Sequence, residues 1–180
     1  MRSTASAIGF LLFLAFAIVF LNSCGVASGT DCFAYASSPF TVKAEGNIDN
    51  SQINATVYYT PESTKSQRTS VMTVIFMSPQ ELERLTVTLF SDGSTSARIG
   101  SLCAEGSEYR ELLVPFYTLL GNVEYSSIKK TDNGEKVVQI KNEHQDLSYY
   151  FKDNSQAPYK IQGNTSGRQI VLTLSDFSFE

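Results

Sequence analysis

The sequence predicts an α+β protein that is mainly β, with an antiparallel sheet, a short helix and a longer apolar helix. Three observations predict this class. Apolar and polar residues alternate along most of the chain from residue 39, turn residues separate these segments, and helical spacing is confined to mid-chain. Roughly ten such strands could form a sandwich, a closed barrel or a curved open sheet. The 180 residues are 42% hydrophobic, which is ordinary for a folded domain.

The first strands are predicted from a period of two. Residues 40–60 alternate in this way on both sides of a turn at Asp49 and Asn50, as expected for strands with one buried face. Residues 71–77 are apolar on both faces, which predicts a central strand with material above and below it. The segment from Ser78 to Glu81 has the pattern of a capping box and predicts a helix of a turn or two. A hairpin of residues 86–99 follows.

The longer apolar helix is predicted at residues 108–120. Its apolar residues recur at intervals of three and four, which is the spacing of one helix face. Pro115 removes an amide donor within it and predicts a kink or a split, and Gly121 is placed to end it. Strand patterns then resume; the expected strands are residues 123–131, 135–141, 147–152, 159–163 and 169–174, with a turn at 132–134.

The amino terminus has the pattern of a secretory signal peptide, which we place at residues 1–23. No charged residue stands between Arg2 and Asp31, and residues 7–21 are almost entirely apolar. The apolar segment is short for a membrane-spanning helix. The alternative is an uncleaved single-pass anchor.

The residues from Leu21 to Cys24 resemble a bacterial lipobox, from which Asn22 departs. This resemblance implies that Cys24 becomes the first residue of the mature protein and carries fatty acyl chains of the palmitate kind, which would hold the chain to a membrane. The alternative is an ordinary cleavage near Ala27. Residues 24–38 are small and polar and predict a lipidated cysteine with a flexible tether, followed by one domain of residues 39–180.

The other two cysteines, Cys32 and Cys103, leave two interpretations open. In an exported protein they could form a disulfide, or they could be two separate thiols, one of them buried. Their spacing does not decide between these.

Composition and motifs argue against several function classes. The chain has 14 Lys and Arg against 18 Asp and Glu, so that it lacks the basic surplus that nucleic-acid binding requires. A single histidine, His144, stands in a polar segment and disfavours zinc sites and histidine-based catalysis. Glu105, Glu108 and Glu111 share a helix-like spacing, which is common near a helix start. We therefore expect no enzyme activity, no cofactor and no metal.

The order of these elements resembles the LolA-like superfamily of bacterial lipoprotein carriers, which includes envelope lipid carriers of the LppX kind. The resemblance rests on the strands of residues 40–60, the short helix and strand of residues 78–88, the apolar helix of residues 112–120, and a Pro-x-x-Ile step from Pro158 to Ile161 before the final apolar strand. It implies a strongly curved antiparallel sheet that forms a half-open barrel, with the helices covering its concave face.

The resemblance also implies that the half-barrel binds or carries a lipid or a lipidated protein. The apolar inner face of the sheet and the covering helix would bind such an amphiphile by removing its hydrocarbon from water. The residues expected to bind it are Val42, Val57, Tyr59, Ile75, Val87, Leu89, Leu112, Leu113, Phe116 and Leu120. In the alternative interpretation, the helix completes a solid core and no cavity exists.

Two hypotheses about function follow. In the first, the chain is an acyl-anchored, non-enzymatic envelope protein with a lipid or a lipoprotein as cargo. In the second, the same fold acts as a sensor or a protein-interaction lipoprotein without cargo. Both predict a monomer that is exported and held, through acylated Cys24, on the outer face of the cytoplasmic membrane or on another envelope membrane of a bacterium.

Overall fold

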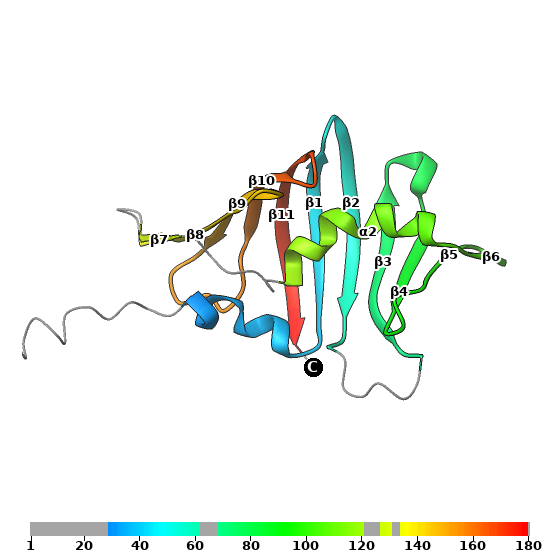
Figure 1. Cartoon of the computed structure of the whole chain (residues 1–180), viewed down its shortest axis with the longest axis horizontal. Helices are drawn as coiled ribbons and strands as arrows, with labels where there is room; N and C mark the ends of the chain where they lie inside the picture. Colours follow the sequence, from blue (N-terminus) through cyan, green and yellow to red (C-terminus); the bar gives the residue numbers. More distant parts are fainter. Residues whose placement is uncertain (1–28, 62–67, 121–126, 131–133, 180) are drawn as a thin grey trace, which may run out of the picture.

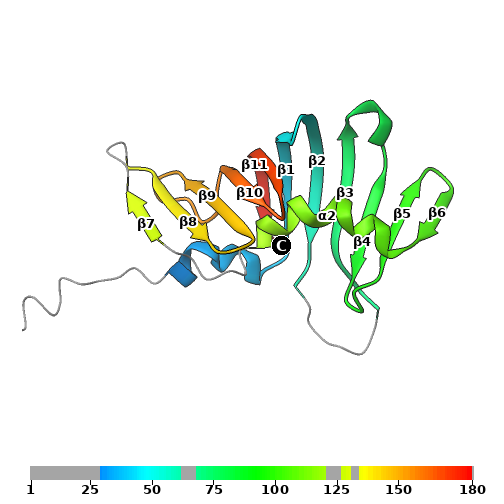
Figure 2. The same ribbon diagram turned by 45° about the horizontal axis from the view of Figure 1, so that its top comes forward.

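The computed structural model describes residues 29–61, 68–120, 127–130 and 134–179. The predicted signal peptide, Cys24 and the predicted turn residues 132–133 lie outside this part of the chain. Within it, 11 antiparallel strands form one sheet in the order β6-β5-β4-β3-β2-β1-β11-β10-β9-β8-β7. The sheet is strongly twisted, and its two edges lie at opposite ends of the molecule, so it is open rather than closed into a barrel (Figures 1 and 2).

The bounds of the elements are as follows. The strands are β1 (Phe40–Ile48), β2 (Ser51–Tyr59), β3 (Ser70–Ser78), β4 (Thr86–Phe90), β5 (Thr95–Ile99), β6 (Leu102–Glu105), β7 (Ser127–Lys130), β8 (Lys136–Lys141), β9 (Gln145–Phe151), β10 (Lys160–Thr165) and β11 (Arg168–Phe179). The helical elements are the α-helix α2 (Arg110–Tyr117) and the 3-10 helices η1 (Gly29–Ser37), η2 (Gln80–Leu82), η3 (Ser107–Tyr109) and η4 (Thr118–Leu120). No helix in the described part of the chain is long and apolar enough to span a membrane.

The first and last strands of the chain meet in the middle of the sheet. β1 pairs with β2 on one side and with β11 on the other, and Ile48 lies opposite Ile170. All other neighbours in the sheet are consecutive in sequence. Two meanders, β2 to β6 and β10 to β7, therefore run outward from the central β1–β11 pair to the two edges.

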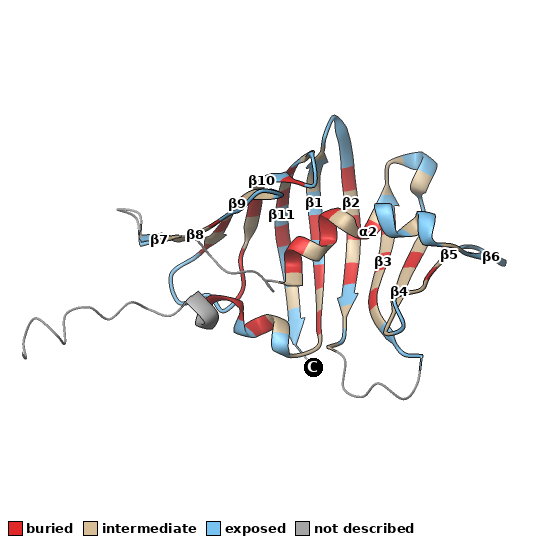
Figure 3. Cartoon of the chain, viewed as in Figure 1, coloured by how far each residue is buried: buried red, intermediate tan, exposed pale blue. Residues whose placement is uncertain are grey.

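One face of the sheet carries the core, and we call it the inner face. Alternate residues of the strands are buried on it and form one apolar cluster with α2 and η1 (Figure 3). The largest fully buried strand side chains of this cluster are Phe40, Met72, Phe76, Ile140, Leu147, Tyr149, Phe151, Ile161 and Ile170. The period of two that predicted the strands is thus the alternation between this face and the outer face.

The chain crosses the inner face because β6 and β7 form opposite edges of the sheet. The crossing segment contains η3, α2 and η4 (Figure 1). Leu113, Phe116 and Leu119 of this segment are fully buried against the strands. The topology, together with the apolar stripe, therefore fixes which face the helix covers.

The crossing segment differs from the single helix that we predicted at residues 108–120. The α-helical part is the 8 residues of α2, and 3-10 turns precede and follow it. Pro115 lies inside α2 without splitting it, and the α-helix ends two residues later. A segment this short derives its stability from packing against the sheet rather than from its own hydrogen bonds. The prediction of a longer apolar helix is wrong, whereas the prediction of its buried stripe is confirmed.

Other local predictions also need correction. Ser78 ends β3 instead of capping a helix, and η2 begins after Pro79 with no side-chain cap. β3 is buried on its inner face, but its outer face is not covered, since Met77 is 55% exposed. The strand β6 was not predicted, because its four residues are all exposed and carry no alternation.

The folded part begins earlier than the predicted tether of residues 24–38 allows. Gly29–Ser37 form η1, and Cys32, Phe33 and Tyr35 are buried against the sheet. Phe33 packs edge-on against Tyr149 with 5.0 Å between the ring centroids. These aromatic contacts order a segment whose small polar residues predicted flexibility.

The two cysteines in the described part of the chain are free thiols. Cys32 is buried in η1, and Cys103 is exposed in the edge strand β6. They are therefore separate thiols in this structure, one of them buried, which agrees with the second of the two interpretations that the sequence left open.

Two glycines let neighbouring strands approach each other closely. Gly46 in β1 and Gly163 in β10 have φ values of 155° and 139°, which side chains rarely adopt. A Cβ atom at Gly46 would overlap the carbonyl oxygen of Val171, and one at Gly163 would overlap that of Asp146. At each of these positions the absence of a side chain is what allows the strands to pair.

Candidate functional site: a groove between α2 and the β1–β2 hairpin

The residues predicted to bind an amphiphile divide into three groups. The first group is fully buried and belongs to the packed core: Val42, Val57, Val87, Leu113 and Phe116. The second group is partly buried and packs against that core: Tyr59, Leu89, Leu112 and Leu120. Ile75 belongs to neither, because its neighbours Val74 and Phe76 occupy the inner face and it faces outward.

The middle of the inner face is occupied by the protein's own side chains. Phe116 of α2 meets Phe76 of β3 edge-on, with 5.9 Å between the ring centroids. Leu113 and Leu119 are also fully buried against the sheet. The side chains that were expected to line a large hollow therefore complete a core, as the alternative interpretation of the helix had it.

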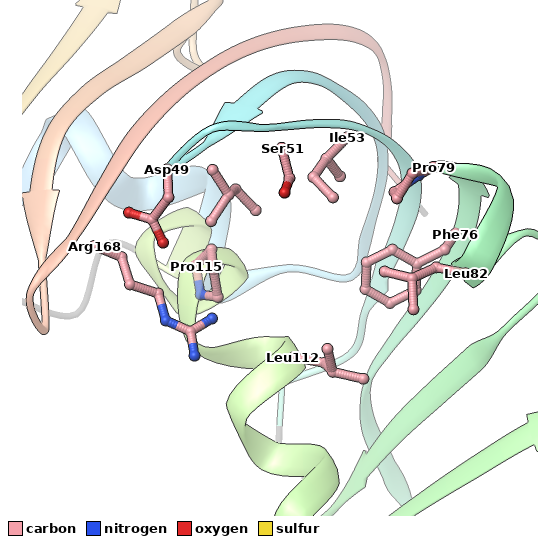
Figure 4. Close-up of a pocket in the computed structure, with 10 residues that line it drawn as sticks. Asp49, Ser51, Ile53, Phe76, Pro79, Leu82, Leu112, Pro115 and Arg168 are labelled. Atoms are coloured by element: carbon pink, nitrogen blue, oxygen red, sulfur yellow. The ribbon is translucent and has the colours of Figure 1, made fainter.

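A groove of about 220 Å³ remains at one end of the inner face, beside the β1–β2 turn. It lies between α2 and the ends of β1, β2, β3 and β11 (Figure 4). Its lining residues are Ile48, Asp49, Ser51, Ile53, Phe76, Pro79, Leu82, Leu112, Pro115 and Arg168. Of the predicted residues, Leu112 alone is among them. The other lining residues were not predicted, because they come from separate segments of the sequence and meet only through the pairing of the strands.

The wall of the groove is mainly apolar. Leu112 and Pro115 come from α2, Phe76 from β3 and Ile53 from β2, and Leu82 of η2 closes one end. Its volume exceeds the roughly 150 Å³ of a cavity that accepts benzene and is smaller than the roughly 300 Å³ of the smallest pockets for drug-sized ligands. The groove therefore suits one hydrocarbon chain or one apolar side chain.

The polar residues of the groove gather on one side of it, where Asp49 and Arg168 lie opposite Phe76 and Leu82 (Figure 4). The Arg168 guanidinium donates to the backbone carbonyl and to Oε2 of Glu111 on α2, each at 3.3 Å. The Glu111 side chain is 70% exposed, and an ion pair of this kind contributes little stability in water. The polar contact between the amino-terminal half of α2 and β11 is thus weak, and the packing of Leu113 is what holds this half to the sheet.

The other end of the crossing segment is held by two buried tyrosine hydroxyls. Tyr35 of η1 donates to the carbonyl of Leu119 at 2.6 Å, and Tyr149 of β9 donates to the carbonyl of Thr118 at 2.9 Å. These bonds satisfy carbonyls at a helix end, which lack partners within the helix. Burial raises the pKa of the Tyr149 hydroxyl above its ordinary value. Burial is also the main cause that raises the pKa of Tyr35, and the nearby Tyr149 raises it further.

These raised pKa values predict a loss of stability in alkali. In the folded protein both tyrosines keep their protons at a pH where the unfolded chain releases them, so their contribution to the free energy of folding is complete below about pH 10 and falls as the pH rises further. We expect Tyr149→Phe to be less stable than the parent protein at pH 7 but to lose less stability between pH 9 and pH 11. Denaturant unfolding followed by circular dichroism at several pH values measures both effects. An equal pH dependence in the two proteins would contradict this assignment.

Two of the acidic residues singled out in the sequence, Glu105 and Glu111, form ion pairs on separate elements of the structure. No group of three His, Cys, Asp or Glu side chains among them could hold a metal ion. Glu105 pairs with Arg68 at 2.9 Å in the β6 edge region, whereas Glu111 pairs with Arg168. Two of the three carboxylates that share a helix-like spacing in the sequence therefore have separate partners.

The comparisons with known proteins bear on the fold. No model of a protein family matches the sequence, and no curated protein matches it. Among solved structures, the chain is similar to an uncharacterized conserved protein from Thermus thermophilus, with 12% identity, a TM-score of 0.50 and 84% of each chain covered. It is also similar to a LolA superfamily protein from Nitrosomonas europaea, with 11% identity, a TM-score of 0.44, and 85% of this chain and 94% of that one covered.

A third similar structure is MucB, with 16% identity, a TM-score of 0.39, and 84% of this chain and 59% of that one covered. Likeness at these identities concerns the fold alone. The structure itself has an open, curved antiparallel sheet with a helical segment across its inner face, which is the arrangement that the sequence predicted. The strand order confirms that the sheet is open rather than closed, and the helix that covers its inner face is shorter than expected.

Proposed function

We propose that this chain is a non-enzymatic binding protein of the bacterial envelope that holds the apolar part of an amphiphile, a lipid or a lipidated protein, in the groove beside α2. The observation that carries this proposal is the groove itself, which is open, mainly apolar and placed between a helix and a sheet. The resemblance of the sequence to the LolA-like carriers agrees with it. The site differs from the one predicted, since it lies at the rim of the inner face rather than at its centre.

The direct test replaces Leu112 in the groove wall. We expect Leu112→Asp to weaken binding of the neutral apolar fluorophore N-phenyl-1-naphthylamine roughly tenfold or more, because a carboxylate in the groove makes the transfer of hydrocarbon unfavourable. Fluorescence titration of the purified exported domain measures this. The matched control is Leu102→Asp, the same change at a 72% exposed leucine in β6, which should leave the affinity unchanged. Equal affinities in the two variants would overturn the proposal.

A second candidate function is a sensor or protein-interaction module without cargo. The observation that favours it is the filled centre of the inner face, which leaves no room for several acyl chains while α2 is in place. Native mass spectrometry of protein taken from membranes in mild detergent separates the two. A bound species of lipid mass supports the first function, and protein that is always empty supports the second.

The anchoring of the chain remains part of the proposal. We propose that Cys24 is acylated and holds the exported protein, as a monomer, at a membrane of the cell envelope. The support is the apolar segment of residues 7–21 and the lipobox-like residues before Cys24. Since η1 begins at Gly29, the tether between the acylated residue and the folded part would be short.

A further inference from the structure

The mouth of the groove carries groups of both charges. Arg168 stands at the first position of β11, and Asp49 lies in the β1–β2 turn beside it. Asp49 is held in place, since its N–H donates to the carbonyl of Gln169 at 2.7 Å and its Oδ1 accepts from the N–H of Gln169 at 2.9 Å. The hydroxyl-bearing Ser51 also lines the groove. A ligand that enters here meets one cation and one carboxylate at fixed positions.

Arg168 is available to a ligand at little cost. Its two hydrogen bonds to Glu111 are 3.3 Å long, whereas charge-assisted bonds in proteins are typically about 2.8 Å. Glu111 is largely exposed and can be solvated when it is released. A phosphate or carboxylate of a ligand can therefore replace Glu111 on the guanidinium with better geometry.

The volume of the groove limits the ligand to one chain. About 220 Å³ lies between the volumes that accept benzene and those that accept a drug-sized molecule. The neighbouring core is closed by Leu113 and Phe116, which are fully buried. Two or three acyl chains have no space here in the described structure.

From these observations, and resting on the proposed function, we propose that the groove binds a single-chain amphiphile with a zwitterionic head group of the lysophospholipid class. The chain lies along Ile53, Phe76 and Leu112, the phosphate lies on Arg168, and the ammonium group lies on Asp49. A purely anionic head group would be repelled by the carboxylates of Asp49 and Glu111. A neutral head group could not replace Glu111 as the partner of Arg168. Only a head group with both charges complements both sides of the mouth.

The experiment compares three ligands with the same myristoyl chain, each below its critical micelle concentration. They are a lysophosphatidylethanolamine, a lysophosphatidylglycerol and a monoacylglycerol, which carry a zwitterionic, an anionic and a neutral head group. Displacement of N-phenyl-1-naphthylamine gives their affinities. We expect the zwitterion to bind roughly tenfold more tightly than either of the others, as one good charged contact allows. Asp49→Asn, which keeps the acceptor for Gln169, should remove the advantage over the anion.

Three further variants separate head-group recognition from other effects. Arg168→Gln should reduce the affinity for the zwitterion to that for the monoacylglycerol, and Arg98→Gln, at an exposed position of β5, should change nothing. Glu111→Gln removes the charge from the contact to α2 but leaves the guanidinium and the bond to the backbone carbonyl of residue 111, so the preference should persist. If it disappears in Glu111→Gln, Arg168 acts through α2 and the head-group inference is overturned. If the three ligands bind with equal affinity, and Leu112→Asp weakens the binding of each, the head-group inference is overturned but the proposed function is not. No binding of any ligand overturns the proposed function.

Discussion

Leu113→Asp is expected to abolish the folded state. Leu113 is fully buried between α2 and the sheet, in one cluster with Phe116 and Phe76. Removing the leucine side chain alone costs about 3 kcal/mol, and placing a carboxylate without a partner in this site adds a comparable amount. The sum is as large as the whole stability of many domains, which is about 5–15 kcal/mol. Circular dichroism and denaturant unfolding of the purified variant measure the loss.

Two control variants make this result specific to the core. Leu113→Ala should remain folded with about 3 kcal/mol less stability, whereas Leu102→Asp, at an exposed position, should change the free energy of unfolding by about 0.5 kcal/mol or less. A Leu113→Asp protein with the stability of Leu102→Asp would mean that α2 does not pack as described. The same result would support the earlier expectation of a cavity on the inner face.

Gly46→Ala is the second substitution with a large expected effect. The residue combines a positive φ with a position where a Cβ atom would overlap the carbonyl oxygen of Val171 in β11. Strain in the backbone and displacement of the neighbouring strand should together lower the free energy of unfolding by roughly 3 kcal/mol or more. Thermal and urea unfolding of the variant measure this loss.

Gly167→Ala is the matched control for the clash. Gly167 also has a positive φ, of 78°, but a Cβ atom there meets nothing within 4 Å. It should therefore show the backbone strain alone, about 1 kcal/mol. If both alanine variants lose the same stability, the close approach of β1 and β11 is not what requires glycine at position 46.

The sequence predicted most strands because alternation records which side chains face the core. It misplaced Ile75, since residues 71–77 are apolar on both faces and their periodicity cannot say which face is inner. The pairing of Val74 with Val57 decides this in the structure. It also missed η1, because Cys32, Phe33 and Tyr35 are apolar residues in a segment without helical spacing, and their burial depends on contacts with β9 and β1.

The groove was beyond sequence reasoning for a different reason. Its apolar residues, such as Ile53, Phe76 and Leu82, are far from Leu112 and Arg168 in the chain and come together at one end of the sheet. No local sequence pattern indicates that these residues line one groove. The resemblance to a carrier superfamily led us to expect an apolar binding site, and the strand register and the crossing segment determine where the groove lies and how large it is.

The central β1–β11 pair has a consequence for how the chain matures. In the described part of the chain β11 follows every other strand, so the two meanders cannot join before it has been synthesised. Until then β1 and β10 each present an open edge that other chains could pair with. Contacts between residues so distant in sequence also form slowly. Protection by a chaperone until β11 has paired would therefore matter more for this protein than for one whose sheet is completed strand by strand in sequence order.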